Sequence, residues 1–310
     1  MRILVTGAAG FIGSHVCERL LSDGHEVVGI DDLSTGTTAN LDHLDVRLVT
    51  GSILDPDALA DAAAGARSIV HLAARPSVPR SIDDPVASHE ANTVGTMRVL
   101  EVARRLDDAH VIVASSSSVY GANPELPKHE GLATLPRSPY AASKLATEQY
   151  ALAWQHSFGL RTLAFRFFNV YGPRQQPGHA YAAVVPAFVD AALRNEPLTV
   201  HGDGSQTRDF TYVGTVSEII ADAVDRGVTW HTPVNLAFGS RTSLLALIEM
   251  IETQTGRPAE RLHVDPRPGD VPHSQADNHL LRSLFPDATA ADLEVGLRET
   301  IEWMAAREQP

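Results

Sequence analysis

The sequence predicts an α/β fold built on a doubly wound parallel sheet, and three observations support this prediction. Apolar runs of strand length alternate with longer segments whose apolar residues recur every three or four positions, as on one face of a helix. The first apolar run leads into a glycine-rich turn, and a later run ends in a row of serines. Such alternation implies parallel strands joined by crossover helices, with ligands bound at the carboxyl ends of the strands.

The expected elements follow one another regularly over the first half of the chain. The expected strands are residues 3–5, 26–30, 46–49, 68–72, 111–114 and 163–167. The expected helices between them are residues 8–21, 54–64, 89–105 and 140–158. Each helix returns the chain to the start of the sheet, so the strands are expected to run parallel.

A second, smaller lobe is expected after residue 169, where proline, glycine and polar residues become more frequent and the alternation loosens. Its expected helices are residues 183–194, 243–255 and 292–307. We therefore expect a cofactor-binding domain of residues 1–170 with a returning segment at about 212–240. Residues 171–211 and 241–310 then form a C-terminal α/β substrate domain.

Composition excludes several classes of protein. A content of 44% hydrophobic and 20% charged residues over 310 positions indicates a folded chain, and no run of about 18 apolar residues exists to span a bilayer. The net charge of −13 disfavours nucleic acid and acidic membranes as partners. An anionic ligand would therefore need a local cationic pocket.

Cysteine, histidine and the first residues add three expectations. The single cysteine, Cys17, cannot form an internal disulfide, and the fourteen histidines are scattered without metal-ligand spacing, so no metal is expected. Met1 leads directly into the first expected strand and leaves no room for a signal peptide. A cytoplasmic location is the resulting expectation.

The glycine-rich turn predicts a dinucleotide site of the Rossmann type. Gly7, Gly10 and Gly13 lie between the first strand and the first helix, where glycine lets the backbone approach a pyrophosphate at the helix N-terminus. An ordinary tight turn is the alternative. Asp31 ends the second strand and could bind an adenosine ribose, while Asp32 would repel a 2′-phosphate, which favours NAD over NADP. The two aspartates could also cap the loop that follows them.

Two further patterns predict a catalytic group. Tyr140 and Lys144 are one helical turn apart at the start of an expected helix, so an ammonium could stabilise a phenolate that acts as a general base. A solvated helix face is the alternative for this pair. Residues 115–118 place four serine hydroxyls after a buried strand, at the edge where such sheets bind ligands.

Together these motifs resemble the extended short-chain dehydrogenase/reductases, specifically their nucleotide-sugar epimerases and dehydratases, and the likeness covers nearly the whole chain. The resemblance implies Tyr140 as the base, Lys144 as its electrostatic partner and Ser116 as the hydroxyl bonded to the substrate O4. It also places Asn92 behind the nicotinamide. Ser52 stands where the family commonly has an aspartate facing adenine, which leaves its adenine contact open.

The resemblance also implies contacts along the rest of the site. Tyr140 and Lys144 are expected to touch the cofactor, and Tyr140 and Ser116 the sugar. Further cofactor contacts are expected from Phe11, Ile12, Ser34, Gly36, Ser52, Ile53, Leu72, Ala73, Ala74 and Phe167. Further contacts to the nucleotide sugar are expected from Ser77, Val78, Arg80, Ser117, Asn169, Ala183, Val184, Val200, Gly202, Arg208, Arg267, Asp270 and Ser274.

Three of these positions bear on the reaction and the substrate. Dehydratases of the family carry an acidic pair where this chain has Ser117 and Ser118, and a serine is not acidic enough for that elimination. Ser274 stands where glucose-restricted epimerases often have a tyrosine, so a small residue leaves room for an acetamido group. Alternatively, Ser274 is the N-cap of a helix at 276–281.

Arg208 and Arg267 match the arginines that clamp the diphosphate in this family, and a guanidinium suits that forked anion. Taken singly, either arginine could instead belong to a surface ion pair. The leading hypothesis is an NAD-dependent C4 epimerase of UDP-GlcNAc/UDP-GalNAc, of UDP-Glc/UDP-Gal, or of both. A UDP-glucuronate 4-epimerase, whose carboxylate Arg80 could meet, and a nucleotide-sugar dehydratase remain open. A catalytically idle NAD-sensing scaffold is the alternative of another class.

Homodimerisation through helices near 89–105 and 140–157 is a further expectation from the resemblance.

Overall fold

A seven-stranded parallel sheet forms the centre of the protein in the computed structural model, which describes residues 1–177, 183–266 and 271–307. The strands lie in the order β11-β6-β5-β4-β1-β2-β3. Their bounds are β1 Arg2–Thr6, β2 Glu26–Asp31, β3 Arg47–Thr50, β4 Ser68–His71, β5 His110–Ser116, β6 Arg161–Phe167 and β11 Val234–Leu236. The predicted doubly wound parallel sheet is confirmed.

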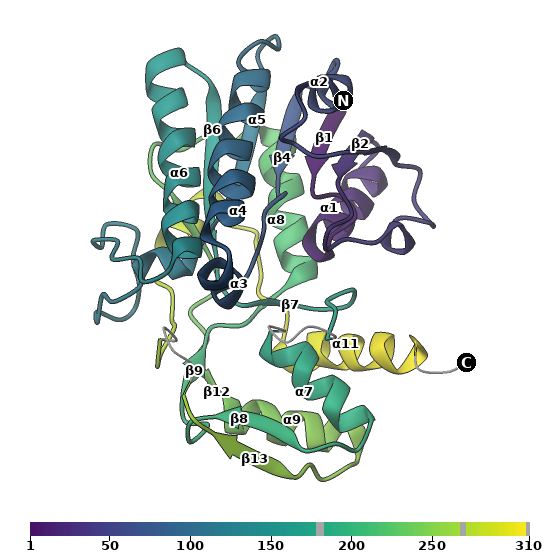
Figure 1. The fold of residues 1–310 in the computed structure, drawn as a ribbon, viewed down its shortest axis with the longest axis vertical. Coiled ribbons are helices and arrows are strands. Elements are labelled where there is room, and N and C mark those ends of the chain that lie inside the picture. The colour runs from purple at the N-terminus through teal and green to yellow at the C-terminus, as the bar shows by residue number, and fades with distance from the viewer. Residues whose placement is uncertain (178–182, 267–270, 308–310) are drawn as a thin grey trace.

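Helices cover both faces of this sheet (Figure 1). One layer contains α2 (Pro56–Ala63), α5 (Gly95–Ala103) and α6 (Pro139–Phe158). The other layer contains α1 (Phe11–Ser22), α8 (Val213–Arg226) and α10 (His279–Leu284). Strand order reverses between β1 and β4, so the crevice between their carboxyl ends is the place where such sheets bind ligands.

Two departures from the expected elements concern the sheet and its helices. Neither α8 nor β11 is among the elements predicted from the sequence, although both lie in the segment expected to return to the first domain. The helix expected at 89–105 is present up to Ala103, but it does not begin as an α-helix. Short helices α3 (Val78–Asp83) and α4 (Pro85–His89) lead into a π-helical turn at Glu90–Val94, and only then does α5 begin.

A smaller lobe lies below the sheet in Figure 1 and has its own apolar core. Its helices are α7 (Val184–Leu193), α9 (Leu244–Thr255) and α11 (Leu293–Arg307), close to the predicted ranges. Its strands form three pairs: β8 (Leu198–His201) with β13 (Arg261–Val264), β9 (Thr207–Arg208) with β12 (Thr242–Ser243), and β7 (Val170–Tyr171) with β10 (Thr211–Tyr212).

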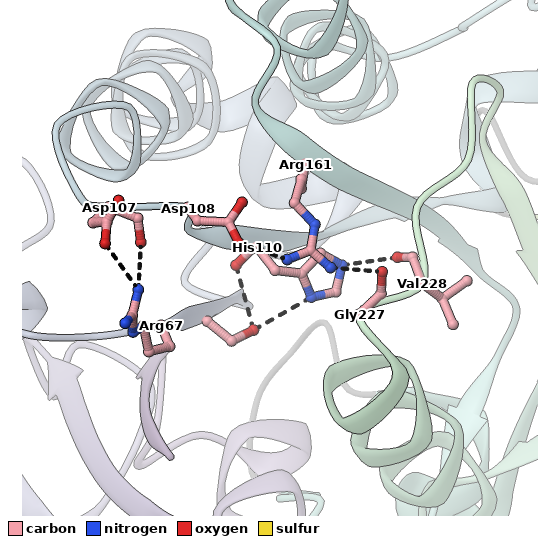
Figure 2. Close-up of polar contacts among 8 residues, drawn as sticks. Arg67, Asp107, Asp108, His110, Arg161, Gly227 and Val228 are labelled. Atoms are coloured by element: carbon pink, nitrogen blue, oxygen red, sulfur yellow. Dashed lines mark hydrogen bonds and ion pairs between the residues drawn. The ribbon is translucent and has the colours of Figure 1, made fainter.

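Polar side chains are paired along the amino ends of β4, β5 and β6 (Figure 2). The buried His110 ring donates from Nε2 to the Val228 carbonyl at 2.8 Å, because a carbonyl can only accept. Arg161 donates to the Gly227 carbonyl at 3.1 Å and pairs with Asp108 at 3.4 Å. These contacts attach the segment after α8 to the sheet.

Candidate active site

The glycine turn after β1 is packed too closely for any other residue. Gly7 has a left-handed backbone (φ 71°), and a Cβ there would lie 2.8 Å from the Ala73 nitrogen. A Cβ on Gly13 would lie 2.0 Å from the Gly7 carbonyl oxygen. The turn therefore brings the first residues of α1 directly beside the start of the segment after β4, at the switch point of the sheet.

Asp31 and Asp32, at the end of β2, both bind the loop that follows. The buried Asp31 carboxylate accepts from the Ala9 nitrogen at 3.0 Å and from the Leu33 nitrogen at 2.8 Å. Asp32 accepts from the nitrogen and hydroxyl of Ser34 at 3.0 and 2.6 Å. The loop-capping role suggested by the sequence is therefore present. Burial raises the pKa of Asp31, while its backbone hydrogen bonds act in the opposite direction.

Ser116, Tyr140 and Lys144 come together where β5 ends and α6 begins. Ser138 caps α6 by accepting from the Ala141 nitrogen at 3.1 Å, which sets Tyr140 in the first turn of the helix. The Tyr140 and Ser116 side chains are hydrogen-bonded. One turn later the buried Lys144 ammonium donates to the Ala114 carbonyl at 2.9 Å.

Burial controls the protonation of this group. It lowers the pKa of Lys144 to about 8 and raises the pKa of Tyr140, which the Ser116 hydrogen bond only partly offsets. The expected lowering of the tyrosine pKa by the lysine is therefore not the dominant effect in the protein by itself. The positive end of the α6 dipole favours a phenolate on Tyr140, and a positively charged ring of a bound ligand would add to that effect.

Two cavities share two residues, and one of them is lined by Ser116. The first, of about 210 Å³, lies in the smaller lobe; its lining includes Ala183, Val184, Gln175, His201, Gln206 and Phe210. The second, of about 250 Å³, lies at the carboxyl edge of β5 and β6; its lining includes Ser116, Ser117, Ser118, Phe167, His273 and Ser274. Asn169 and Arg208 line both cavities and so mark their junction.

Comparison with known proteins identifies the family. Residues 3–237 match the NAD dependent epimerase/dehydratase family. This chain belongs to that family. It is 39% identical over 321 residues, with both chains fully covered, to the UDP-glucose 4-epimerase of Mycolicibacterium smegmatis.

Two solved structures of the family are also similar. One is the UDP-N-acetylglucosamine 4-epimerase of Methanobrevibacter ruminantium in complex with UDP-N-acetylmuramic acid, with a TM-score of 0.93, 34% identity, and 99% and 98% of the two chains covered. The other is the UDP-glucuronic acid 4-epimerase of Bacillus cereus in complex with UDP-glucuronic acid and NAD, with a TM-score of 0.91, 31% identity, and 99% and 100% covered. The predictions of an extended short-chain dehydrogenase/reductase of the nucleotide-sugar epimerase type, of an enzyme and of NAD as its cofactor are confirmed.

The residues around the family's cofactor crevice fit NAD. Gly36 approaches the Ala9 backbone so closely that a Cβ there would lie 2.8 Å from the Ala9 carbonyl carbon, so the loop after β2 folds over the glycine turn. Ile53 is buried against Gly95. The hydroxyl of Ser52 accepts from the Leu54 nitrogen at 3.2 Å and so stabilises the turn in which Ser52 lies.

The expected contacts around the nicotinamide end have different surroundings. Ala73 follows β4 beside the glycine turn, and its nitrogen donates to the Thr6 hydroxyl at 3.1 Å. Asn92 lies in the π-helical turn, where its amide donates to the Ser143 hydroxyl at 2.9 Å and its carbonyl accepts from the Arg75 nitrogen at 2.7 Å. Protein partners therefore hold the Asn92 side chain at both ends. Leu72, Ala74, Phe11 and Ile12 are half-buried at the same crevice.

The structure separates the expected substrate residues into three groups. Those that line a cavity are Val78, Ser116, Ser117, Asn169, Ala183, Val184, Arg208 and Ser274. Those that line neither cavity are Ser77, Arg80, Tyr140, Val200 and Gly202. Arg267 and Asp270 lie outside the described residues.

Ser77 and Val200 illustrate why a position near the site does not guarantee a contact. Ser77 caps α3, with its hydroxyl accepting from the Arg80 nitrogen at 3.5 Å. Val200 points to the other side of β8 from the exposed Thr199 and is fully buried in the core of the smaller lobe. Alternation along a strand sends neighbouring side chains to opposite faces.

Ser274 lies on the wall of the second cavity and is not a helix cap. The helix expected at 276–281 begins only at His279, and its N-cap residue is Asn278. The Ser274 nitrogen instead donates to the Thr207 carbonyl at 3.1 Å, and its side chain is buried. The N-cap alternative for Ser274 is therefore wrong.

Sequence reasoning missed several residues that line the cavities. Lys128 and Arg137 line the second cavity, and Gln175 and Gln206 line the first. Arg137 lies three positions before Tyr140, and that closeness is a signal that could have indicated it. Lys128 gives no such signal.

The described residues form neither a metal-binding cluster nor a membrane-spanning helix. No group of three or more His, Cys, Asp or Glu side chains in those ranges comes together as a metal site requires. None of the helices described has the length and apolar character needed to span a bilayer.

Proposed function

We propose that this chain catalyses C4 epimerisation of a UDP-hexose, with UDP-GlcNAc/UDP-GalNAc and UDP-Glc/UDP-Gal as substrates. One observation carries the proposal. Ser116, bonded to Tyr140, lines a cavity of sugar size in which none of the described lining residues is an aspartate or glutamate. The relatives named as UDP-sugar 4-epimerases support the same reaction.

The chain's own groups act on the hydroxyl at C4. Ser116 holds the sugar O4 in the second cavity and passes its proton toward the Tyr140 oxygen, which acts as the base. Lys144, buried one turn along α6, supplies the positive charge that favours the phenolate. NAD bound beside the glycine turn would supply reversible hydride transfer at C4. Small side chains along the wall, among them Ser117 and Ala141, leave room for the sugar to turn.

The two cavities divide the substrate. We assign the nucleotide to the first cavity, the diphosphate to the Asn169 and Arg208 junction, and the hexose to the second cavity. A guanidinium suits a diphosphate because its donors match pairs of phosphate oxygens. This assignment keeps residues 1–170 and 212–240 as the cofactor domain, and 171–211 with 241–310 as the substrate domain, except that α10 packs on the sheet of the cofactor domain. Pairing of β11 with β6 and packing of α8 on α1 support it.

Dehydration is disfavoured by the same cavity. Eliminating water next to a keto group requires a second acid and base, and Ser117 and Ser118 occupy the positions where the acidic pair is expected. The Ser118 hydroxyl oxygen is buried and has no hydrogen-bond partner in the described part of the chain.

Ser274 is proposed to admit the acetamido group of N-acetylated sugars. Its small side chain lines the second cavity and its backbone is fixed by the Thr207 carbonyl. Ser274→Tyr should reduce kcat/KM for UDP-GlcNAc by about 100-fold while UDP-glucose loses less than about 3-fold, because a clash rejects a substrate more strongly than a lost contact. Equal losses for both sugars, measured by steady-state kinetics, would show that Ser274 does not select between N-acetylated and neutral sugars.

A homodimer in the cytoplasm completes the proposal. The pairing surface would be the α5 and α6 side of the sheet, where Phe158 remains 53% exposed although it lies at the end of an otherwise packed helix. Sedimentation equilibrium of the purified protein tests the assembly.

Incubation with UDP-GlcNAc and with UDP-glucose, followed by separation of the sugar nucleotides, tests the reaction. We expect each to yield its C4 epimer without net consumption of NAD. A product lighter by one water would support the dehydratase, and no product from either sugar would reject the proposal. Tyr140→Phe serves as the matched control, since it removes only the base.

A further inference from the structure

Three cationic residues line the second cavity. Lys128, Arg137 and Arg208 all line it, whereas aspartate and glutamate are absent from the described lining residues. The whole chain has a net charge of −13, so the local charge of this cavity wall is opposite in sign to that of the protein. Local charge of this kind indicates an anionic ligand.

Arg208 is accounted for by the diphosphate, but the other two cations are not. Arg208 lines both cavities, as expected for a residue at the junction where the diphosphate is placed. Lys128 and Arg137 line only the second cavity. Their charge therefore acts on the hexose rather than on the nucleotide.

Lys128 is a buried cation that pairs with no carboxylate in the described chain. Its residue is only 7% exposed, and its ammonium donates to the carbonyl of Asn123. The Glu125 carboxylate favours the charged form of Lys128 from a distance, but Glu125 itself lies 3.5 Å from the His129 ring. Burial lowers the pKa of Lys128, because the charged form has lost water without gaining an anion.

The backbone holds Lys128 beside the wall that carries Ser274. Its nitrogen donates to the Gln275 carbonyl at 2.8 Å, and its carbonyl accepts from the Asp277 nitrogen at 2.8 Å. Asn235 donates a further bond to the same carbonyl at 2.8 Å. The lysine is thus fixed in place relative to the cavity and does not belong to a freely moving loop.

Arg137 approaches the cavity from the residue before the cap of α6. It is exposed, and no hydrogen bond or ion pair involves its side chain among the residues that the structure describes. A free guanidinium three positions before Tyr140 can turn toward a substrate that is already in place.

We propose that Lys128 and Arg137 recognise a carboxylate on the hexose, so that acidic UDP-hexoses are substrates and are preferred over their neutral analogues. This inference rests on the proposed function and names the substrate class of the same cavity. A neutral hexose offers hydroxyls to a buried ammonium but leaves its charge unbalanced. A carboxylate supplies the missing anion and a charge-assisted hydrogen bond.

Two matched pairs of substrates test the preference in the holoenzyme. UDP-glucuronate has a carboxylate in place of the C6 hydroxymethyl group of UDP-glucose, and UDP-N-acetylmuramate carries on O3 of UDP-GlcNAc a lactyl ether that ends in a carboxylate. We expect at least one acidic member to exceed its neutral partner about 10-fold or more in kcat/KM. The pair that shows the preference tells where the carboxylate lies.

Substitutions assign that preference to the two cations. Lys128→Met should raise KM for the preferred acidic sugar about 10- to 100-fold, and Arg137→Gln about 3- to 10-fold because that side chain is exposed. KM for the neutral partner should rise much less, by about 3-fold at most, because only a hydroxyl contact is lost. Lys128→Arg should retain the preference. Arg105→Gln, an exposed cation after α5, is the control and should change neither KM.

Two outcomes would overturn the inference: neutral sugars preferred by the unaltered enzyme, or variants that impair both members of a pair equally. Binding of each sugar nucleotide by calorimetry separates this failure from failure of the proposed function. If neither UDP-GlcNAc nor UDP-glucose yields its C4 epimer, the proposed function fails, whereas selective loss of acidic-sugar binding in Lys128→Met would still support the carboxylate site. Equal binding of acidic and neutral sugars would reject it.

Discussion

The two edges of the central sheet treat polar side chains in opposite ways. At the amino ends of β4 to β6, the cationic side chains have partners: Arg67 pairs with Asp107, Arg161 with Asp108, and His110 with a backbone carbonyl (Figure 2). At the carboxyl ends, the buried Lys144 and Lys128 ammonium groups each donate to a backbone carbonyl, and neither pairs with a carboxylate in the described part of the chain. One edge is closed by its own contacts, and the other keeps charge available for ligands.

This difference separates stability from function on one scaffold. Substitutions at the carboxyl edge should change activity strongly and stability little, or even favourably. Substitutions at the amino edge should change stability alone. The following predictions test that contrast in order of decreasing effect.

The largest effect is expected from Tyr140→Phe. Removing the phenolic oxygen removes the base and should lower kcat about 1,000-fold, which is the usual scale for losing a general base. The midpoint of thermal unfolding should change little, because the neutral hydroxyl loses one side-chain hydrogen bond, to Ser116, worth about 1 kcal/mol. Steady-state assays and calorimetry measure the two quantities. Retention of more than a tenth of the activity would exclude Tyr140 as the base.

Lys144→Met should abolish most activity yet change how stability depends on pH. The pKa of Lys144 falls from 10.5 to about 8 on folding, so between those values the unfolded chain holds more protons and stability rises with pH. The charged form is thus destabilised by about 3 kcal/mol below pH 8. Thermal unfolding between pH 7 and 10 should show this rise in the unaltered protein and lose it in the variant. An unchanged slope would contradict the unpaired buried charge.

At the amino edge, His110→Gln should affect acid stability and leave kcat unchanged. Burial lowers the pKa of His110 from 6.5 to about 4, so the unfolded chain takes up the proton first and stability is lost as pH falls through that window. Burial also lowers the pKa of His15 and of His71. The variant should therefore still lose stability as the pH falls, but less steeply than the unaltered protein. Urea unfolding from pH 7 to 4 measures it. His156→Gln, an exposed histidine, is the control, and an equal change in both variants would reject the assignment.

The smallest effect is expected from Arg67→Gln. The side chains of Arg67 and Asp107 are 57% and 94% exposed, so their 3.2 Å ion pair is screened by water. Its loss should cost about 0.5 kcal/mol or less in urea unfolding and nothing in activity. A cost above about 1.5 kcal/mol would show that this edge depends on the pair more than its exposure implies.

The parts of this molecule that could be predicted from the sequence depend on neighbours along the chain. Strands β1 to β6 follow from short apolar runs, and the relation of Tyr140 to Lys144 follows from one turn of helix. Strand β11 is only three residues long, too short for a periodic pattern. The π-helical turn at Glu90–Val94 interrupts a continuous helical pattern because Asn92 bonds to Arg75 and Ser143, which are distant in sequence.

The position of Lys128 in the candidate site could not be predicted for the same reason. Its place at the second cavity depends on hydrogen bonds to Gln275 and Asp277, almost at the other end of the chain. Ser274 was recognised by its resemblance to a family position, but its local pattern wrongly allowed a helix cap. Helix α10 starts later because Asn278 donates to the Phe238 carbonyl and holds the preceding turn out of the helix.

Asp209 has a consequence for how such an enzyme could diversify. This fully buried carboxylate accepts from the nitrogens of Gly239, Ser240 and Ala276, so it fixes the backbone behind Ser274 without using the side chain at 274. Residues on that wall belong to no helix or strand and can be exchanged while the main chain stays anchored. Substrate range can therefore drift over generations by single replacements, at little risk to the inherited scaffold.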